Sequence, residues 1–408
     1  TVNMFYFLTD RPVALLTLVC LAEVLSMASF AAWPLFLVDL QPLWGLSNFA
    51  TGWISGGYFI GYVLATPVLV GLTDRIDAKY IYIFSSLLAF AGALCFAFFA
   101  AGFWSAALSW GLVGAGLAGT YMPGLQILNA RLGDRDRIKL LPYYTSAFGV
   151  GTGLSFFLMG WMYTHTSWEN AFFLAAIFSL FSAALIFFII RPSPPVQTKM
   201  TVKRHPLDFR PAFRNKPALG YIFAYGAHNF ELFAYRGWLF AYLIFASNHF
   251  RIEVGAATLS SLMSVFAIIG MSASIIGASI CLKYGRAKTI ARFGALSAVT
   301  AILFGLSGFV NFYLVLAMAL LFNITIMLDS ASLTAGTVSR ASEHDRGALL
   351  AVHTIIGFGG AALGAPAIGF VLDKAGGETD LHGWAIALMT IGLGSALVWL
   401  ILRRRQMD

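Results

Sequence analysis

PVALLTLVCLAEVLSMASFAAWPLFL, residues 12–37, is an apolar run broken only by small polar residues and a single acid, Glu23. A helix that crosses the roughly 30 Å hydrocarbon core of a bilayer needs about 20 mostly apolar residues. The run is long enough for this, and its length, together with Trp33 and Pro34, does not fit a cleaved signal peptide. It therefore predicts a transmembrane helix that remains in the mature protein.

Similar apolar runs fill the rest of the chain. Of its 408 residues, 59% are hydrophobic and 11% are charged, which gives more apolar surface than a soluble fold can bury. Only helices and closed barrels satisfy their backbone groups inside lipid, and unbroken runs of this length select helices. The sequence therefore predicts an all-α membrane protein with twelve transmembrane helices. The expected spans are 12–37, 48–70, 80–101, 104–130, 143–163, 168–190, 218–245, 255–281, 289–309, 312–338, 348–371 and 383–402.

One long polar connection divides these spans six and six. Residues 191–217 are rich in proline and basic residues and carry no apolar helical stripe. We therefore expect an N-terminal six-helix bundle in residues 1–190, a cytoplasmic linker in 191–217 and a C-terminal six-helix bundle in 218–408. Sliding the second half along the first by 208 or 209 residues aligns Glu23 with Glu231, as in transporters built from internal repeats. The two bundles are therefore expected to be pseudo-symmetric.

Basic residues mark one side of the membrane. Cytoplasmic loops retain Lys and Arg, and in the expected loops nearly all of them fall on the side of the N-terminus. Arg251 and Lys374 fall on the other side. Both termini are therefore expected in the cytoplasm, and the expected location is a bacterial inner membrane. Topology and anionic lipid account for the net charge of +8, so no nucleic-acid partner is expected.

The loop after the second span carries a recognisable pattern. Residues 71–80 read GLTDRIDAKY and resemble the loop motif of the major facilitator superfamily, usually G-x-L-x-D-R-x-G-R-R/K. The matching residues are Leu72, Asp74, Arg75 and Lys79. The departures from the motif are Val70, Asp77 and Ala78. The second-half counterpart, residues 277–288, keeps the basic residues of the motif but has no acid.

The resemblance extends over the whole chain. Residues 110–124, WGLVGAGLAGTYMPG, look like the glycine-rich fourth helix of the superfamily, with Trp110 where many proton-coupled members carry an arginine. Glycine-rich residues 147–155 and 355–366 fit faces along which neighbouring helices approach and slide. Membership implies two six-helix bundles, a monomer, and transport of a small solute by alternating access.

Few charged residues fall inside the expected spans. An ionised group at mid-bilayer costs roughly 2.5–3.5 kcal/mol even on a lenient scale, so such residues usually face a cavity or one another. They are therefore the candidates for the functional site. Together with two histidines they are Glu23, Glu231, Arg236, Asp329, His228 and His353.

These groups suggest an anion-binding cavity. With about 100° per residue, His228 lies between Glu231 and Arg236, so the three share a broad helical face. In the superfamily the first and seventh helices line the central cavity, which implies that Glu23 and Glu231 approach it from opposite halves. We expect Arg236 to hold an anionic substrate through two parallel hydrogen bonds. The alternative is that Arg236 only pairs with Glu231 or Asp329 and holds helices together.

The remaining candidates complete the expected site. Glu23, Glu231 and Asp329 are expected to exchange protons, because an apolar setting favours the neutral form of a carboxyl group. His228 and His353 are expected to contact substrate and to titrate readily. Aromatic cavity walls are also expected, although packing is the commoner role of such residues. These aromatic candidates are Tyr121, Tyr225, Trp238, Phe233 and Tyr235.

Charged loop residues are the expected gate. In the superfamily the loop after the second helix latches the two halves in one of two alternating states, which implies this role for Asp74 and Arg75. Such a latch joins a charge to a helix end and breaks when the halves rock. The matching loops of the two halves each carry a further acid–base pair that is expected to belong to the same gate. The alternative is that these pairs are solvated loop residues without a role in gating. These pairs are Asp136 with Arg137 and Asp345 with Arg346.

The expected function is secondary active transport. A lone intramembrane arginine among three carboxyl groups favours a small organic or inorganic anion moved together with protons. Proton-driven export of cationic or amphipathic compounds is the first alternative, because carboxyl groups and aromatic residues suit it equally well. A membrane sensor that binds without transport is a further alternative, although it needs neither repeat symmetry nor paired gate loops.

The sequence carries no signature of an enzyme. No GxSxG, HExxH or Walker pattern is present, and no soluble domain is expected that would bind a nucleotide. Cys20, Cys95 and Cys281 lie in apolar spans without CxxC spacing, which indicates neither a disulfide framework nor a zinc site. We therefore expect no enzymatic activity, no cofactor and no metal. The expected partners are a small-molecule substrate, protons and the lipid bilayer.

Overall fold

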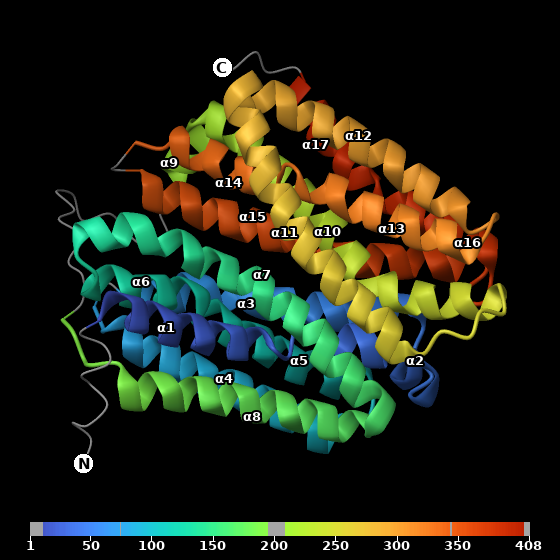
Figure 1. Ribbon diagram of the computed structural model, residues 1–408, viewed down its shortest axis with the longest axis horizontal. Helices are drawn as coiled ribbons and strands as arrows, with labels where there is room; N and C mark the ends of the chain where they lie inside the picture. Colours follow the sequence, from blue (N-terminus) through green and yellow to red (C-terminus); the bar gives the residue numbers. More distant parts are fainter. Residues whose placement is uncertain (1–10, 74, 195–208, 343–344, 404–408) are drawn as a thin grey trace.

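The structure, a computed structural model, describes residues 11–73, 75–194, 209–342 and 345–403, which are helical throughout apart from short connections (Figure 1). The helices of the first half of the chain are α1 (Pro12–Met27), α2 (Ala32–Leu43), α3 (Asn48–Leu72), α4 (Ala78–Phe99), α5 (Phe103–Ala118), α6 (Tyr121–Arg131), α7 (Asp134–His165) and α8 (Trp168–Ile189). The short α9 (Arg210–Arg214) precedes the second half. That half contains α10 (Lys216–His249), α11 (Ala256–Tyr284), α12 (Arg286–Ser307), α13 (Phe312–Met327), α14 (Ser330–Ser339), α15 (Arg346–Lys374), α16 (Leu381–Ile391) and α17 (Leu393–Arg403). The prediction of an all-α fold is confirmed.

Several of these helices join into longer membrane segments. Among the described residues, nine segments are long and apolar enough to cross a bilayer, and three of them consist of two helices each, α1 with α2, α13 with α14 and α16 with α17. The other three expected spans are helical as well, in α5 with α6, in α7 and in α10. These three spans are not among the nine apolar segments. One of them, α10, carries the polar residues His228, Glu231 and Arg236.

Side-chain caps fix where many helices begin. Ser47 accepts a hydrogen bond from the backbone of Ala50 at the start of α3, and Asp77 accepts one from Lys79 at the start of α4. Asn215 begins α10 in the same way. Such caps satisfy backbone N–H groups that have no partner within the helix, and they place the helix ends at the polar edges of the membrane segments.

The two halves of the chain lie beside each other with their helices running in broadly the same direction (Figure 1). Contact between them is made chiefly by α3 against α15 and by α7 against α11. Within the first half, α3 packs on α5 and α4 on α8; within the second, α10 packs on α15 and α12 on α17. The face between the halves is therefore formed by helices from both.

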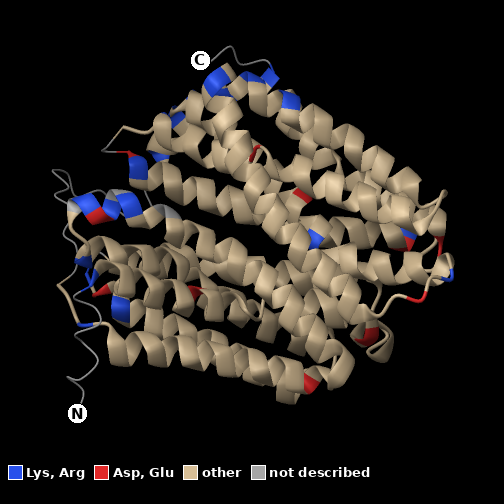
Figure 2. Cartoon of the chain, in the orientation of Figure 1, with Lys and Arg blue, Asp and Glu red and all other residues tan. Residues whose placement is uncertain are grey.

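Charged residues gather at the two ends of the helices (Figure 2). One end carries most of the Lys and Arg, and we name it the basic end; it is the end at which α1 begins and α17 ends. The other carries residues of both signs, and we name it the opposite end; it is the end at which α2 ends and α3 begins. Between them the helices are almost free of charge, as a hydrocarbon environment requires.

An aromatic cluster forms the core of the first half. The rings of Phe96 and Phe172 stack with centroids 3.8 Å apart, and Trp110 meets Phe172 edge-on at 5.5 Å. Trp33 lies 6.0 Å from Phe96. Offset and edge-on aromatic pairs stabilise each other beyond simple burial, so α2, α4, α5 and α8 are tied into one unit.

Candidate functional site

Arg236 is a buried cation without a partner among the described residues. It lies in the middle of α10 with only 9% of its surface exposed. No hydrogen bond or ion pair joins its guanidinium group to another described residue; its nearest notable neighbour is the ring of Phe233, whose centroid lies 5.8 Å away. The expected alternative, pairing with Glu231 or Asp329, is therefore wrong for this state. An arginine buried without a counter-charge is costly, and binding an anion removes that cost.

A small cavity lies next to Arg236 and is walled by both halves of the chain. The space open to the centre of a water molecule is about 20 Å³, enough for one or two waters. Aromatic side chains of the first half, together with Phe233 of the second, make most of its wall. The lining residues are Phe30, Trp33, Pro34, Ser55, Tyr58, Phe59, Trp110, Phe233, Arg236 and Gly237. Because α1–α2, α3, α5 and α10 all contribute, any movement between the halves changes the shape of this cavity.

An aromatic layer bridges the halves on the side of the cavity that faces the basic end. Phe59 of α3 lies 4.4 Å from Phe233 of α10, and Tyr62, one turn further along α3, lies 4.2 Å from Phe358 of α15. Phe233 and Phe358 are 6.2 Å apart.

Helices α3 and α15 pack backbone against backbone at the opposite end. A Cβ atom added to Gly52 or to Gly56 of α3 would come within 2.5 Å of a carbonyl oxygen of α15, and one on Gly369 would overlap the carbonyl of Asn48. A Cβ on Gly71 or on Gly347, at the basic end of the same two helices, would meet nothing within 4 Å. The halves therefore touch backbone to backbone at the opposite end, whereas these two positions at the basic end meet no neighbour.

Hydrogen bonds reinforce this contact at the opposite end. The carboxylate of Asp373, at the end of α15, accepts from the backbone N–H groups of Asn48 and Phe49, both at 2.9 Å. The Asn48 side-chain amide also donates to Asp373 and to Glu378, again at 2.9 Å. An acid is placed at the N-terminus of a helix from the other half, where the helix dipole favours negative charge. We name this group, Asn48, Phe49, Asp373 and Glu378, the inter-half latch.

Glu23 is enclosed within the first half. It is fully buried on α1; the Tyr144 hydroxyl of α7 lies at the 3.5 Å limit of a hydrogen bond to its Oε2, and its Oε1 accepts none from a described residue. Glu23 does not line the cavity beside Arg236. The expectation that it reaches a cavity shared with Arg236 is therefore wrong for this state, because its side chain turns toward α7 instead.

Glu231 is similarly enclosed within the second half. The hydroxyl of Ser297 on α12 donates to its Oε1 at 3.0 Å, and the hydroxyl of Ser395 on α17 donates to its Oε2. Five residues separate Glu231 from Arg236, which turns the two side chains about 140° apart on α10. Glu231 is turned toward α12 and α17 and is absent from the cavity lining, so the expectation that both line the cavity is corrected.

His228 and Asp329 lie against each other between α10 and the start of α14. The Nδ1 atom of His228 is 2.8 Å from Oδ1 of Asp329, and both residues are buried. The Nε2 atom of His228 has no hydrogen-bond partner among the described residues. Tyr225 stacks between the two histidines, 4.0 Å from His353 and 6.1 Å from His228. His353 itself approaches Thr334 at 3.3 Å and Thr337 at 3.1 Å. These groups form a polar cluster separate from the lining of the Arg236 cavity.

Two aromatic candidates serve packing in this state. The indole N–H of Trp238 donates to the carbonyl of Ala365 at 2.9 Å, and its ring lies 6.2 Å from Trp384, inside the second half. Tyr121 stacks on Tyr144 at 5.6 Å inside the first half. Neither lines the cavity beside Arg236, nor do Tyr225, His228 and His353. Among the described candidates for substrate contact, the cavity brings together Arg236 and the expected aromatic wall residue Phe233.

The expected gate residues lie at the basic end, and Asp74 falls outside the described residues. Arg137 donates to the carbonyls of Asn129 and Leu132, and Asp345 accepts from Ser342. These contacts stay within one half each. The remaining members of the expected gate are partly or fully exposed, namely Arg75, Asp136 and Arg346.

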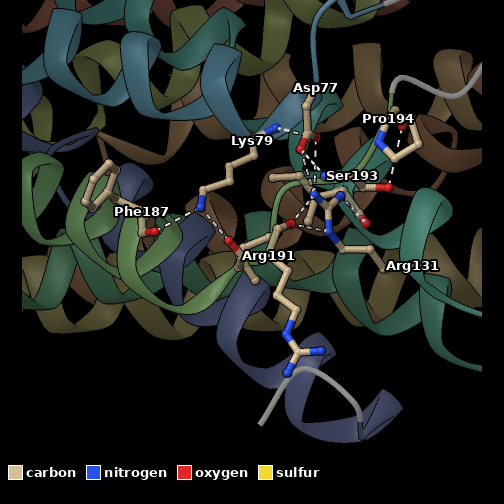
Figure 3. Close-up of polar contacts among 9 residues, drawn as sticks. Asp77, Lys79, Arg131, Phe187, Arg191, Ser193 and Pro194 are labelled. Carbon is tan, nitrogen blue, oxygen red and sulfur yellow. Dashed lines mark hydrogen bonds and ion pairs between the residues drawn. The ribbon is translucent and has the colours of Figure 1, made fainter. Parts of the chain in front are cut away.

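Other residues of the motif loop anchor it to the end of α8 (Figure 3). Asp77 forms an ion pair with Arg131 at 2.9 Å and accepts from the backbone of Ser193 at 2.7 Å. The ammonium group of Lys79 donates to the carbonyls of Phe187 and Ile190, which end α8 without partners in the helix. Asp77, where the motif has glycine, therefore ties the loop to the segment that leads toward the second half.

Sequence reasoning missed the inter-half latch and most of the cavity wall. The latch residues lie at the ends of expected spans. The sequence signal that could have found them is the pair Ser47-Asn48 at the start of one helix, together with an acid, Asp373, at the end of a glycine-rich helix. Trp33 and Trp110 line the cavity, and Trp110 had already stood out as a replacement for arginine. Among the described residues, no group of three or more His, Cys, Asp or Glu side chains is arranged to hold a metal ion.

Comparison with known proteins identifies the family to which this architecture belongs. The family profile described as Major Facilitator Superfamily matches residues 18–365. No curated protein shows significant sequence similarity to the chain. Among solved structures, a mutant of the nucleoside transporter NupG is 16% identical with a TM-score of 0.77, covering 95% of this chain and 99% of that one.

Two further solved structures are similar. A bacterial homologue of the human lysosomal transporter Spinster, in an inward-facing and unoccupied conformation, is 13% identical with a TM-score of 0.77 and covers 96% and 97% of the two chains. A POT family transporter bound to a thioalcohol-conjugated peptide is 13% identical with a TM-score of 0.73 and covers 96% of each chain. At such identities the likeness concerns the fold, a multi-pass transporter fold, and carries no substrate. With most of its length matched by the family profile, the chain belongs to the major facilitator superfamily.

Proposed function

We propose that this protein is a secondary active transporter that moves a small anion together with protons by alternating access. The observation that carries the proposal is Arg236, a cation buried beside a central cavity without a described partner. Guanidinium groups bind carboxylates and other oxyanions through paired hydrogen bonds, and the neutralisation removes the cost of a bare charge in an apolar setting.

The contacts between the halves support alternating access. In this state α3 and α15 are packed tightly at the opposite end and held by the inter-half latch, whereas an aromatic layer separates the cavity from the basic end. Rocking of the halves would break the latch and close the basic end, where Arg75, Asp136 and Asp345 would meet the other half. An ion gradient drives such a cycle.

Protons are the proposed coupling ion, with Glu23, Glu231 and Asp329 as carriers. Asp329 lies 2.8 Å from Nδ1 of His228, which places two titratable groups side by side in a buried position. Glu231 is held by two serine hydroxyls that can donate or accept as its protonation changes. Glu23 occupies the matching place in the first half.

The orientation proposed for the protein follows from its charge distribution. The basic end (Figure 2) is the end at which α1 begins and α17 ends, and cytoplasmic segments retain Lys and Arg. We therefore place both termini in the cytoplasm of a bacterial cell, with the chain as a monomer in the inner membrane. The cavity then opens to the cytoplasm through the aromatic layer.

The anion site is tested by replacing Arg236. Purified wild type, R236A and R236K are compared in thermal unfolding with formate, acetate, benzoate, nitrate and phosphate, because a ligand of the folded state raises its melting temperature. K283A is the matched control, since Lys283 is an exposed cation at the end of α11. At least one anion should stabilise the wild type and K283A, and R236A should lose that stabilisation. R236K keeps the charge and distinguishes loss of binding from loss of folding.

The outcome also separates the alternatives. Stabilisation by tetraphenylphosphonium and by no anion would contradict the proposal and favour an exporter of cationic compounds. Counterflow of the stabilising anion in proteoliposomes distinguishes transport from sensing, because a sensor binds without exchange.

Proton coupling has a test of its own. Proteoliposomes loaded with a pH-sensitive dye should show a pH change when the stabilising anion is added outside, and D329N should weaken that change more than it weakens anion binding. Anion exchange without any pH change would contradict proton coupling while leaving the anion site in place.

A further inference from the structure

The side chains that line the cavity around Arg236 indicate which class of ligand the cavity binds. From the charge, the unpaired donors and the wall of this cavity we infer that the transported anion is a monocarboxylate with an apolar, ring-sized body, an inference that rests on the proposed function. Three features of the cavity lead to this class, and each excludes a different kind of anion.

The first feature is a single charge. Arg236 is the one charged side chain in the cavity lining, which the structure describes completely. A monoanion leaves the buried site neutral, whereas a dianion leaves one negative charge without a partner in an apolar setting. The cavity therefore favours a monoanion over a dicarboxylate or a doubly ionised phosphate.

The second feature is an excess of hydrogen-bond donors. Trp33 lines the same cavity, is fully buried, and its indole Nε1–H has no acceptor among the described residues. The guanidinium group of Arg236 adds donors without described partners, and indole and guanidinium groups only donate. A carboxylate offers two acceptor oxygens side by side and no donor, which matches this set.

The third feature is the apolar wall. Tyr58 and Trp110 lie 5.1 Å apart, Phe30 lies 6.0 Å from Tyr58, and Phe59 lies 4.4 Å from Phe233. Such a wall gains nothing from a hydrated inorganic ion, and its two hydroxyls, on Ser55 and Tyr58, are too few to partner the several hydroxyls of a sugar acid. An aromatic or branched apolar body packs against it and replaces ring contacts that are already present.

The size of the ligand's apolar body is limited by the space that the side chains of the cavity wall can vacate. The space now open to a water centre is about 20 Å³, so the ligand enters only when aromatic side chains turn away. Phe59 and Phe233 belong both to the cavity wall and to the aromatic layer. Turning these two rings frees room for one ring beside Arg236, and the path from the basic end opens when Tyr62 and Phe358 turn as well.

The test compares small molecules that each differ from the inferred class in one property. Benzoate and phenylacetate have the inferred class; phthalate adds a second charge, gluconate replaces the apolar body, benzamide removes the charge and nitrate removes the body. The melting temperature of the purified wild type in detergent should rise with benzoate or phenylacetate and stay unchanged with the other four. A rise with phthalate, gluconate or nitrate that equals or exceeds the rise with both monocarboxylates would overturn the inference, as would no rise with either monocarboxylate.

Two variants connect the result to the cavity. W33F keeps an aromatic ring and removes the N–H, and it should weaken phenylacetate or benzoate binding about tenfold, since a hydrogen bond to a charged group is lost. W104F is the control, because Trp104 is 74% exposed on α5 and lies outside the cavity lining. Equal affinity in W33F and W104F would remove Trp33 from the argument and overturn the donor match.

The same panel separates this inference from the proposed function. If nitrate or gluconate stabilises the wild type at least as much as both monocarboxylates do, and R236A abolishes the effect, the anion site stands and the inferred ligand class falls. If tetraphenylphosphonium stabilises the protein and no anion does, both fall.

Discussion

Replacing Asp373 by asparagine should loosen the closed opposite end of the molecule. The carboxylate of Asp373 holds the beginning of α3 by accepting from the backbone N–H groups of Asn48 and Phe49 and from the side chain of Asn48. The side-chain amide of the D373N variant would present one neutral carbonyl oxygen in place of two charged oxygens. Its N–H₂ group is itself a donor and would face the N–H groups of Asn48 and Phe49. The substitution changes neither the volume of the side chain nor the helix.

The magnitude follows from the contacts that are lost. Charge-assisted hydrogen bonds are roughly twice as strong as neutral ones, and an acid at a helix N-terminus adds about 0.3–1 kcal/mol. Asp373 is exposed, so water competes for these groups and the smaller end of the range applies. We expect the closed opposite end to lose about 1–2 kcal/mol, which shifts the ratio of closed to open molecules about 5-fold to 30-fold.

The shift is measurable as a distance between the halves. Spin labels at Leu43 of α2 and at Glu253, between α10 and α11, lie at the opposite end on different halves, and both positions are exposed. In a background lacking the three native cysteines, D373N should add a population at longer distance that the parent lacks or shows weakly. Transport assays on the same variant report whether the shift changes turnover.

D380N is the matched control. Asp380 also lies at the opposite end and also caps a helix, accepting from the backbone of Gly383 at 2.7 Å, but that helix belongs to its own half. D380N should lower thermal stability slightly and leave the distance distribution unchanged. An unchanged distribution in D373N, or the same change in both variants, would refute the role given to the inter-half latch.

Three further substitutions test other contacts. G369L puts a side chain where the carbonyl of Asn48 now lies, so the same spin-label pair should report a larger opening than in D373N, and an unchanged distance would contradict close packing of α3 on α15. K79M removes two contacts to the end of α8 and should lower the free energy of unfolding by about 1–3 kcal/mol without changing the distance, which thermal unfolding and spin labelling together check. S395A leaves Oε2 of Glu231 without its donor and should lower the free energy of unfolding by about 1–2 kcal/mol; equal stability to the wild type would show that another group replaces the hydroxyl.

The membrane segments could be predicted closely because their signal is local. The expected spans 80–101 and 168–190 correspond to α4 at 78–99 and α8 at 168–189. The turn between α1 and α2 could not be predicted, because residues 28–31 continue the apolar pattern and the break is held from a distant helix. The Ser155 hydroxyl of α7 accepts from the backbone N–H of Ala31 and donates to the carbonyl of Ala28. Hydropathy reports where a segment lies in lipid and not whether its helix is continuous.

The site was predictable in its residue types and not in its geometry. The rarity of charge inside lipid identified Arg236, which lies beside the central cavity. The same argument identified Glu231, but residue spacing determines only the angle between these two side chains on α10, not the rotation of the helix against its neighbours. That rotation turns Glu231 toward Ser297 and Ser395. The inter-half latch was beyond reach because Asn48 and Asp373 are 325 residues apart.

The aromatic cluster of the first half gives the protein an optical reporter of its own. Of the ten tryptophans, Trp33 and Trp110 line the Arg236 cavity and are also packed into the rigid cluster around Phe96 and Phe172. A charged group that arrives beside their indole rings changes the local field, and the emission wavelength of a buried indole follows that field. Intrinsic fluorescence should therefore register occupancy of the cavity without any label, and its time course would give the rates at which ligand enters and leaves.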